Sequence, residues 1–235
     1  MIVAPVIVAP VIAQADEPFV RWDWVGRNLD NLWAATQEHI VLTGIAIGIG
    51  LIISMGLSIV ALRWRKTYTP ITWVTGLLYA IPSLALFALL VPITGLTLLT
   101  AEIGLVSYTL LILIRNIVAG IDGVPEPIIE AARGMGYTER KLFTDIQLPL
   151  AMPVIIAGVR IATVTTIGLI TITALIGQGG LGFFILRGLQ FYSAIGTTQI
   201  LAGTVLSVVL AVTADLLLLG LERLLTPWAR RRAVM

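Results

Sequence analysis

Few residues in this sequence are of types that could carry out chemistry, and they do not form a catalytic set. Gly177, Gly179 and Gly182 spell the pattern G-x-G-x-x-G. That pattern binds dinucleotides when it follows a strand, opens a helix and precedes an acidic residue by about 20 positions. Here it follows a long apolar stretch and residues 200–204 read ILAGT, so a close-packed or flexible loop is favoured.

Metal and nucleophile chemistry is excluded on residue counts. The chain has one histidine, His39, and no cysteine, so it cannot build a histidine–cysteine metal site or a nucleophile–base pair. His39 stands at the edge of an apolar stretch and is expected at the membrane interface. No G-x-x-x-x-G-K-[ST] motif occurs, so this chain does not itself cradle nucleotide phosphates.

Three charges interrupt long apolar stretches, where an ionised side chain is costly and is usually paired or functional. Arg160 and Asp215 are both expected at the same depth, in the inner third of a membrane. We therefore predict an ion pair between them, serving as a strut or as part of a gate. Glu102 is expected near the outer surface, within reach of water.

Other polar positions are candidates for a translocation path. Thr163, Thr166 and Thr173 fall on one helical stripe, which could line a polar route or bond to the backbone or a neighbouring helix. Pro82, followed by Ser83, is expected to kink its helix and free a backbone carbonyl, as a hinge or gate would.

The elements that position these residues are membrane helices. Of 235 residues, 58% are hydrophobic and 12% are charged, far from the composition of soluble domains. Stretches of about 20 apolar residues predict spans, which must be helical. The fold class is therefore all-α integral membrane, with spans at Val41–Leu62, Ile71–Ile93, Leu98–Ile114, Leu150–Ile176 and Ile200–Leu219.

The positive charges predict the orientation. Eleven of the 15 Lys and Arg residues fall on one side if the loop after the first span is cytoplasmic. This puts the N-terminus outside and the C-terminus inside. The scattered basic residues indicate topology rather than a nucleic-acid surface, so no nucleic-acid partner is expected, and the bilayer is the expected surroundings.

Three regions follow from this pattern. Residues 1–38 form an outer or interfacial segment, 39–223 a transmembrane domain and 224–235 a basic cytoplasmic tail. Ala13-Gln14-Ala15 resembles a signal-peptide end, but no positive region precedes it, so a retained segment is favoured over a cleaved signal. Trp22, Trp24 and Trp33 favour a helix between Phe19 and Glu38 lying at the membrane interface.

A polar insert, residues 126–149, separates the third and fourth spans. Apolar residues at helical spacing predict a first helix that ends at Gly134 and Gly136. Thr138 can cap a second helix, and Pro149 forces an exit into the next span. Two amphipathic helices need a cover. The first helix shows its apolar residues at Ile128, Ile129, Ala132 and Met135, and the second at Leu142, Phe143 and Ile146.

The spacing within the insert resembles the EAA motif of type I ABC importer permeases. It consists of Glu130, Ala131 and Ala132, then Gly136, then Ile146, Leu148 and Pro149. The resemblance implies that these residues form the coupling helices, which contact a separate ATPase subunit. It also implies a second permease subunit, an extracytoplasmic solute-binding protein and a bacterial cytoplasmic membrane. ATP and magnesium would then be bound by the ATPase, with no cofactor in this chain.

Further segments resemble the permeases of osmoprotectant importers, which carry glycine betaine, choline, carnitine or proline. They include the Ile81–Leu86 and Gly158–Thr163 runs and Gly179–Gly182. A permease for polar amino acids or methionine is the alternative within this class. An ion-coupled secondary transporter or channel should show inverted repeats or several midplane ionisable residues, which the sequence lacks. A membrane scaffold without transport is a third class.

Overall fold

The structure is a computed structural model that describes residues 18–190 and 194–228, and these residues form helices without strands. Among these residues, four helices are long and apolar enough to cross a membrane, and a bent pair brings the number of spans to as many as five. All five predicted spans lie within these helices. The long helices are α2 (Leu29–Arg63), α5 (Leu98–Asp122), α8 (Leu148–Thr173) and α10 (Ala194–Leu225).

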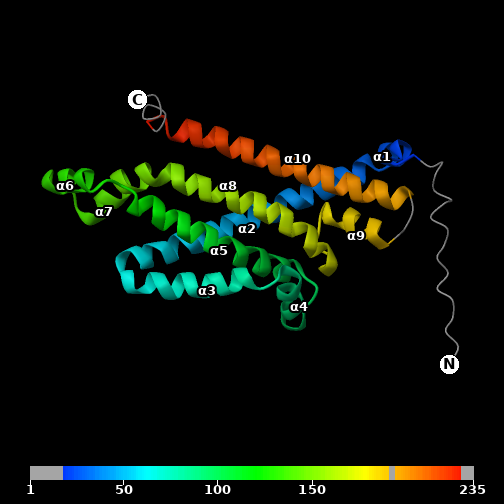
Figure 1. Cartoon of the computed structure of the whole chain (residues 1–235), viewed down its shortest axis with the longest axis horizontal. Coiled ribbons are helices and arrows are strands. Elements are labelled where there is room, and N and C mark those ends of the chain that lie inside the picture. Colours follow the sequence, from blue (N-terminus) through cyan, green and yellow to red (C-terminus); the bar gives the residue numbers. More distant parts are fainter. Residues whose placement is uncertain (1–17, 191–193, 229–235) are drawn as a thin grey trace.

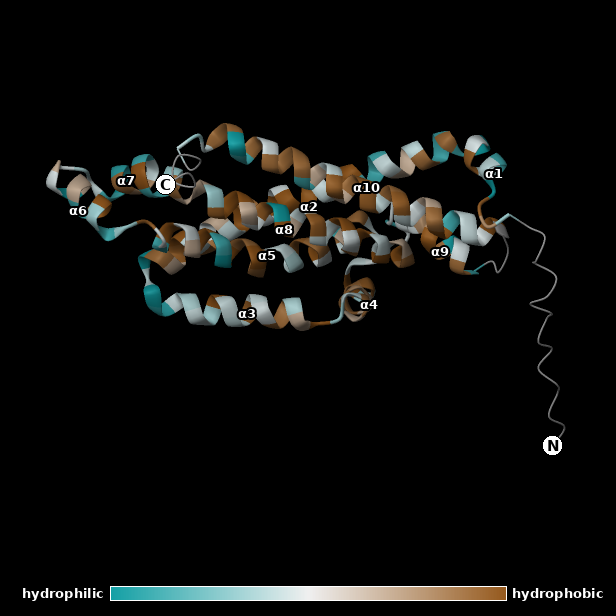
Figure 2. Ribbon diagram, turned by 45° about the horizontal axis from the view of Figure 1, so that its top comes forward, coloured by the Kyte–Doolittle hydropathy of each residue, from teal (hydrophilic) through white to brown (hydrophobic). Residues whose placement is uncertain are grey.

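The shorter helices gather at the ends and along one side of this bundle. The loop helices α6 and α7 project at one end, whereas α1 and α9 lie at the other (Figure 1). Hydrophilic residues also concentrate at these two ends, and the long helices between them are mostly hydrophobic (Figure 2). The short helices are α1 (Trp22–Arg27), α3 (Tyr68–Ala80), α4 (Ser83–Thr94), α6 (Glu126–Gly134), α7 (Glu139–Leu142) and α9 (Gly182–Gln190).

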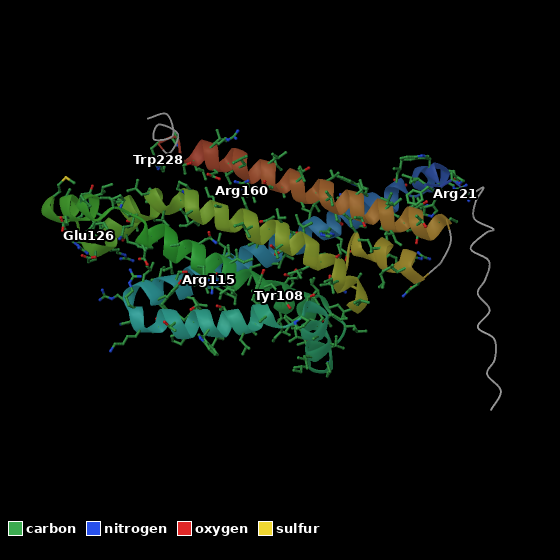
Figure 3. All side chains as sticks on the ribbon, viewed as in Figure 1. Arg21, Tyr108, Arg115, Glu126, Arg160 and Trp228 are labelled. Carbon is green, nitrogen blue, oxygen red and sulfur yellow. The ribbon has the colours of Figure 1, made fainter. Side chains whose placement is uncertain are left out.

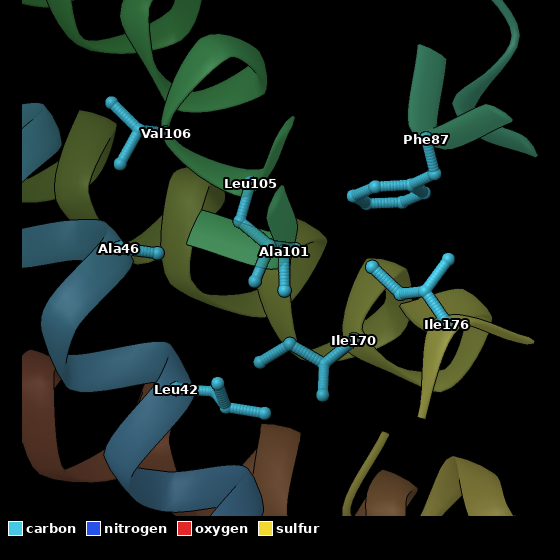
Figure 4. Close-up of a cluster of buried hydrophobic side chains, with 8 residues drawn as sticks. All are labelled: Leu42, Ala46, Phe87, Ala101, Leu105, Val106, Ile170 and Ile176. Atoms are coloured by element: carbon cyan, nitrogen blue, oxygen red, sulfur yellow. The ribbon is translucent and has the colours of Figure 1, made fainter. Parts of the chain in front are cut away.

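Helix α5 is the centre of the packing. It contacts α2, α3, α4 and α8, whereas α10 packs chiefly on α8 and α9 and leaves most of its surface exposed. The largest buried cluster joins α5 to its neighbours through Leu42, Phe87, Leu105 and Ile170 (Figure 4). Apolar residues face outwards as well as inwards, as expected where the surroundings are lipid.

Small residues let α5 and α8 approach closely. A Cβ at Gly158 of α8 would stand 2.4 Å from the Cβ of Asn116 on α5, closer than two carbons can lie. Gly50 of α2 meets α5 in the same way, because its Cβ would lie 2.1 Å from Thr109 Oγ1. Close backbone approach of this kind is how membrane helices gain packing energy where lipid offers no hydrophobic drive.

The second span breaks at Pro82 more sharply than the predicted kink. Helices α3 and α4 meet at 95°, and Ile81 between them is extended (φ −64°, ψ 129°). Proline disfavours the helical region for its preceding residue, which explains the extended Ile81. The first backbone bond of α4 runs from Leu86 to Pro82, so the Ile81 carbonyl lies outside the helical ladder.

The N-terminal region differs from the predicted interfacial helix. This region divides into the short α1 and the first turns of α2. Because α2 begins at Leu29, it continues without a break across the predicted boundary between residues 38 and 39. Strong helix formers continue the first span outward beyond its apolar part, and apolar periodicity alone does not reveal this. Ala13-Gln14-Ala15 and most of the basic tail, residues 229–235, lie outside the described residues.

The glycine-rich run after α8 is a close-packed turn. This is the structure that the sequence favours for it over a nucleotide-binding loop. A Cβ at Gly179 would lie 2.3 Å from Ala174, and one at Gly182 would lie 2.4 Å from the Thr171 backbone. The run folds α9 back against α8 and α10.

Candidate functional site

The end of α6 is closed by a specific backbone motif. The Tyr137 amide donates to the Ala132 carbonyl at 3.1 Å, and the Gly136 amide donates to the Arg133 carbonyl at 2.9 Å. Gly136 is in the left-handed region, with φ +85°. This pattern is the Schellman motif, in which glycine fits because a Cβ disfavours the left-handed conformation. The glycine of the EAA pattern therefore makes the turn between the two loop helices.

The next helix begins where the sequence predicts. The Thr138 side chain accepts a hydrogen bond from the Lys141 amide at 3.4 Å and so caps α7. The chain then stays helical through a π turn, Phe143–Gln147, into α8. Pro149 lies in the first turn of α8, where a proline's missing amide costs no helical bond, so the next span begins at this proline as predicted. The chain reaches it through the π turn without leaving the helical conformation.

The two loop helices cover each other. Ile129 and Ala132 of α6 are buried against Leu142 of α7, with Val124 in the same cluster. The cover that the two amphipathic helices need is therefore supplied, for this cluster, by the helices themselves. Sequence periodicity located the apolar stripe but could not show that the tight turn folds it onto its neighbour.

The EAA residues consequently divide into two groups. Glu130, Ala131 and Gly136 lie on the exposed surface of the loop, and Met135 beside them is 70% exposed. Ala132 is fully buried and supports α6 from within. The half-buried residues Ile146, Leu148 and Pro149 lie where the loop enters α8.

Arg133 ties α6 to α7, a role that sequence reasoning missed. Its guanidinium donates to Glu139 at 3.1 Å and lies 3.8 Å from Glu126. The hydrogen bond to Glu139 raises the pKa of Arg133 above its usual value, and the negative charges of the nearby carboxylates raise it further. Glu126 lies on α6 at the projecting end of the molecule (Figure 3).

A second ion pair anchors the base of the loop. Arg65, in the turn after α2, donates to both oxygens of Asp122 at 2.7 and 2.5 Å. Asp122 is the last residue of α5 and precedes α6 by only a short connection. The hydrogen bond to Asp122 raises the pKa of Arg65. The orientation of α6 is thus linked to α2 as well as to α5.

Arg160 and Asp215 lie together, as the sequence predicts. The Arg160 guanidinium donates to both Asp215 oxygens at 2.8 and 2.9 Å, which joins α8 to α10. Figure 3 labels Arg160. Glu222 is a further partner at 3.4 Å that sequence reasoning missed. Asp215 and Glu222 are seven residues apart on α10 and so share one face. Use of this cluster as a gate stays a prediction.

The predicted threonine stripe is buried within the subunit. Thr163, Thr166 and Thr173 are at most 6% exposed. Thr163 bonds its own helix at Val159, and Thr173 bonds the carbonyls of Ile170 and Gln178. Backbone bonding is one of the two uses that the sequence allows for these residues. A polar route along the stripe stays a prediction.

Pro82 and Ser83 form the break between α3 and α4, where another helix supplies a missing bond. The Tyr108 hydroxyl, from α5, donates to the Ile81 carbonyl (Figure 3 labels Tyr108). The freed carbonyl expected near Pro82 therefore has a partner. Any gating by this break stays a prediction.

Two expectations about polar residues near the outer surface are wrong. Glu102 does not reach water: it is 7% exposed, because α5 is surrounded by other helices at this level. His39 is fully buried rather than interfacial, and its Nε2 lies 3.0 Å from the Ile167 carbonyl of α8. In both cases the tertiary contacts of α2 and α5 decide the burial.

Solved structures of a membrane transporter share this fold. Two inward-facing crystal forms of the MetNI methionine ABC transporter superpose with TM-scores of 0.71 and 0.73, at 22% and 20% identity. Each match covers at least 85% of this chain and 98% of the other. At this identity the likeness shows the fold alone, and it confirms the predicted type I ABC importer permease fold.

Relatives found by sequence have a higher identity to this chain than these two structures do. The choline transport system permease protein OpuBB of Bacillus subtilis is 36% identical over 87% of this chain and 93% of its own length. The osmoprotectant import permease protein OsmW of Salmonella typhimurium is 35% identical, over 87% and 98%. The carnitine transport permease protein OpuCB of Listeria monocytogenes is 35% identical, over 88% and 94%.

A family-level match covers most of the described bundle. Residues 46–227, from within α2 to just beyond α10, match the family described as binding-protein-dependent transport system inner membrane component. The relatives are named as transport permeases rather than as enzymes. The fold, the relatives and this match agree, and the chain belongs to the family of binding-protein-dependent transport system inner membrane components.

Proposed function

We propose that this chain is the membrane-spanning permease subunit of an ATP-driven importer of compatible solutes. The solute class is a quaternary amine such as glycine betaine, choline or carnitine, or proline. Support comes from relatives at about 35% identity that are named for choline, carnitine and osmoprotectant transport. ATP hydrolysis, with bound ATP and magnesium, belongs to a separate ATPase subunit.

The exposed surface of the α6–α7 loop carries the proposal. Glu130, Ala131, Met135 and Gly136 form a projecting surface whose interior is its own apolar cluster. Ion pairs at Arg133 and Arg65 hold that surface in position. A rigid projection with one exposed face is suited to docking into a groove on the ATPase.

Movement of the loop has a direct route to the membrane helices. Because α7 continues through the π turn into α8, a displacement of the loop is passed to α8 without an intervening hinge of loop residues. Arg160 then links α8 to α10. Closure of two ATPases would in this way reorient both helices and switch the path between inward- and outward-facing states.

The remaining partners follow from the same proposal. A second permease subunit, identical or different, completes the path, and an extracytoplasmic binding protein delivers the solute. The N-terminus lies outside and the C-terminus inside, which keeps the α6–α7 loop on the ATPase side of the bacterial cytoplasmic membrane. The excess of basic residues on that side supports this orientation.

Uptake measurements test the proposal. The chain is expressed with its ATPase and binding protein in cells lacking osmoprotectant uptake, and radiolabelled glycine betaine, choline, carnitine, proline and methionine are supplied. We expect ATP-dependent uptake of at least one of the first four solutes, and uptake of methionine alone would contradict the solute class. Ala131→Arg should detach the ATPase and abolish uptake, whereas Thr69→Arg, exposed outside the loop, should not.

A further inference from the structure

A polar cavity lies at the end of the molecule opposite the α6–α7 loop. It has a volume of about 530 Å³ and is enclosed by α1, the start of α2, α9 and the first turns of α10. These elements gather at one end of the bundle in Figure 1. The cavities along α10 are lined mainly by apolar residues, as lipid contact requires, whereas this cavity combines charged, amide and aromatic side chains.

One lining side chain is both buried and unsatisfied. Gln199 of α10 is 8% exposed, and its Oε1 has no hydrogen-bond partner among the described residues. Close packing holds this part of α10 in place. One turn further along the helix, a Cβ at Gly203 would lie 2.8 Å from the Leu181 carbonyl oxygen. The preceding Thr198 accepts a hydrogen bond from the Arg21 amide at 2.9 Å, which holds α1 against α10. A buried carbonyl oxygen without a partner favours an electropositive ligand group.

The walls of the cavity carry opposite charges. Glu38 of α2 and Arg187 of α9 both line it and are exposed to it. The Arg187 guanidinium lies 5.8 Å from the Phe183 ring centroid, which restrains the arginine on that wall. Trp24 and Phe184 pack edge to face with centroids 6.0 Å apart and add aromatic surface between α1 and α9.

We propose that this cavity binds a small zwitterion that joins an ammonium group to a carboxylate. The ammonium group lies against Glu38, the Gln199 oxygen and the Trp24 ring, because each of these attracts positive charge. The carboxylate lies against the Arg187 guanidinium, which presents paired donors to a planar anion. An anion alone would be repelled by Glu38, and an apolar ligand would bring no positive charge to Glu38 and the Gln199 oxygen.

The cavity volume sets the ligand size. A site of about 530 Å³ is within the range of small-molecule pockets and is too small for a protein segment with tertiary structure. The assignment of the site rests on the cavity itself, and its use in solute uptake rests on the proposed function. In that setting the site would hold solute on the permease at its outer face, before the path opens inward.

Direct binding to the purified full-length chain in lipid nanodiscs tests the site. Calorimetry uses three probes: glycine betaine, choline, which lacks the carboxylate, and 3,3-dimethylbutan-1-ol, which has the shape of choline without its charge. We expect saturable binding of glycine betaine, weaker binding of choline and none of the neutral alcohol. Glu38→Gln and Gln199→Leu should weaken both charged probes at least tenfold.

Arg187→Gln separates the two ends of the ligand. It should weaken glycine betaine at least tenfold and change choline less than twofold. The exposed residues Gln37 and Asp30, which do not line the cavity, provide matched controls as Gln37→Leu and Asp30→Asn. Glu38 and Arg187 are also exposed, so their substitution leaves the helix packing intact even if Gln199→Leu does not fold.

Three outcomes would overturn the site: no binding of glycine betaine to the wild type, equal binding of the neutral alcohol, or binding unchanged in Glu38→Gln and Arg187→Gln. The proposed function is judged separately, by uptake through the assembled transporter. Uptake without binding here would remove the site alone. Binding here without uptake would remove the proposed function and leave the site.

Discussion

At the scale of single residues, Gly136 is required for its conformation and not for space. Its φ is +85°, and no atom of a residue beyond its two chain neighbours lies within 4 Å of where its Cβ would be. Gly134, two residues earlier, also has open space but a helical backbone. The two glycines therefore separate the effect of backbone strain from the effect of added volume.

We expect Gly136→Ala to destabilise the α6–α7 turn by about 1 kcal/mol, because an alanine in the left-handed region crowds its own carbonyl. Local opening of residues 131–142 should rise about fivefold in hydrogen exchange, and solute uptake per ATP should fall. Gly134→Ala is the control and should leave both unchanged or protect the turn. Equal effects of the two substitutions would show that volume, not conformation, matters.

Local chemistry could be predicted at this scale, and distant partners could not. The ending of α6 at its glycines and the Thr138 cap follow from residue types a few positions apart. The Tyr108 bond to Ile81 joins residues 27 positions apart on different helices, so no local pattern reveals it. Glu222 was missed for the same reason, because nothing in α10 alone shows that two of its turns face one arginine.

At the scale of elements, Tyr108 maintains the break between α3 and α4. We expect Tyr108→Phe to cost about 1 kcal/mol of stability, because the Ile81 carbonyl lies outside the helical ladder and loses its donor. Thermal unfolding in detergent measures this cost. Tyr79→Phe is the control. The ring centroids of Tyr79 and Tyr108 lie 5.8 Å apart, but the Tyr79 hydroxyl makes no hydrogen bond among the described residues.

The same substitution should loosen the break itself. A single cysteine at Ser83, in a chain that has none of its own, should react faster with a thiol reagent when Tyr108 is phenylalanine. Unchanged reactivity and stability would show that Pro82 alone sets the 95° angle.

The α8–α10 ion cluster is a second element-level link. Arg160→Asp would place three carboxylates together, and Asp215→Arg would place two guanidiniums beside Glu222. Each single change should lower the yield of monodisperse protein in size-exclusion chromatography. The double exchange should recover much of the yield, because opposite charges then face each other again. A double variant no better than the poorer single variant would contradict a pairing role.

At the scale of the whole molecule, the spans were predictable and their contacts were not. Long apolar stretches define five spans because a bilayer demands about 20 apolar residues per helix. The same uniform apolarity hides which face meets which neighbour. The inward and outward faces of α2 are almost equally apolar, so small residues such as Gly50, and not periodicity, determine where it meets α5.

Burial of Glu102 and His39 illustrates the same limit. Both lie near predicted span ends, where sequence reasoning expects contact with water or the interface. Helix α2 begins at Leu29, well before its apolar part, so His39 lies inside the bundle. Helix α5 begins at Leu98 as predicted, and the helices packed around it cover Glu102 instead. A span's length in the structure exceeds its apolar length, and polar residues at its ends become interior residues of the bundle.

The orientation of the whole chain determines on which side of the membrane the α6–α7 loop lies. With the α6–α7 loop in the cytoplasm, Asp30 and Arg140 lie on opposite sides of the membrane, and both are exposed. Since the chain has no cysteine, Asp30→Cys and Arg140→Cys each provide one reactive thiol. A membrane-impermeant maleimide applied to intact spheroplasts should label Asp30→Cys, and should label Arg140→Cys only after permeabilisation. The reverse pattern would place the coupling loop outside, away from any ATP, and would remove both the orientation and the proposed coupling to an ATPase.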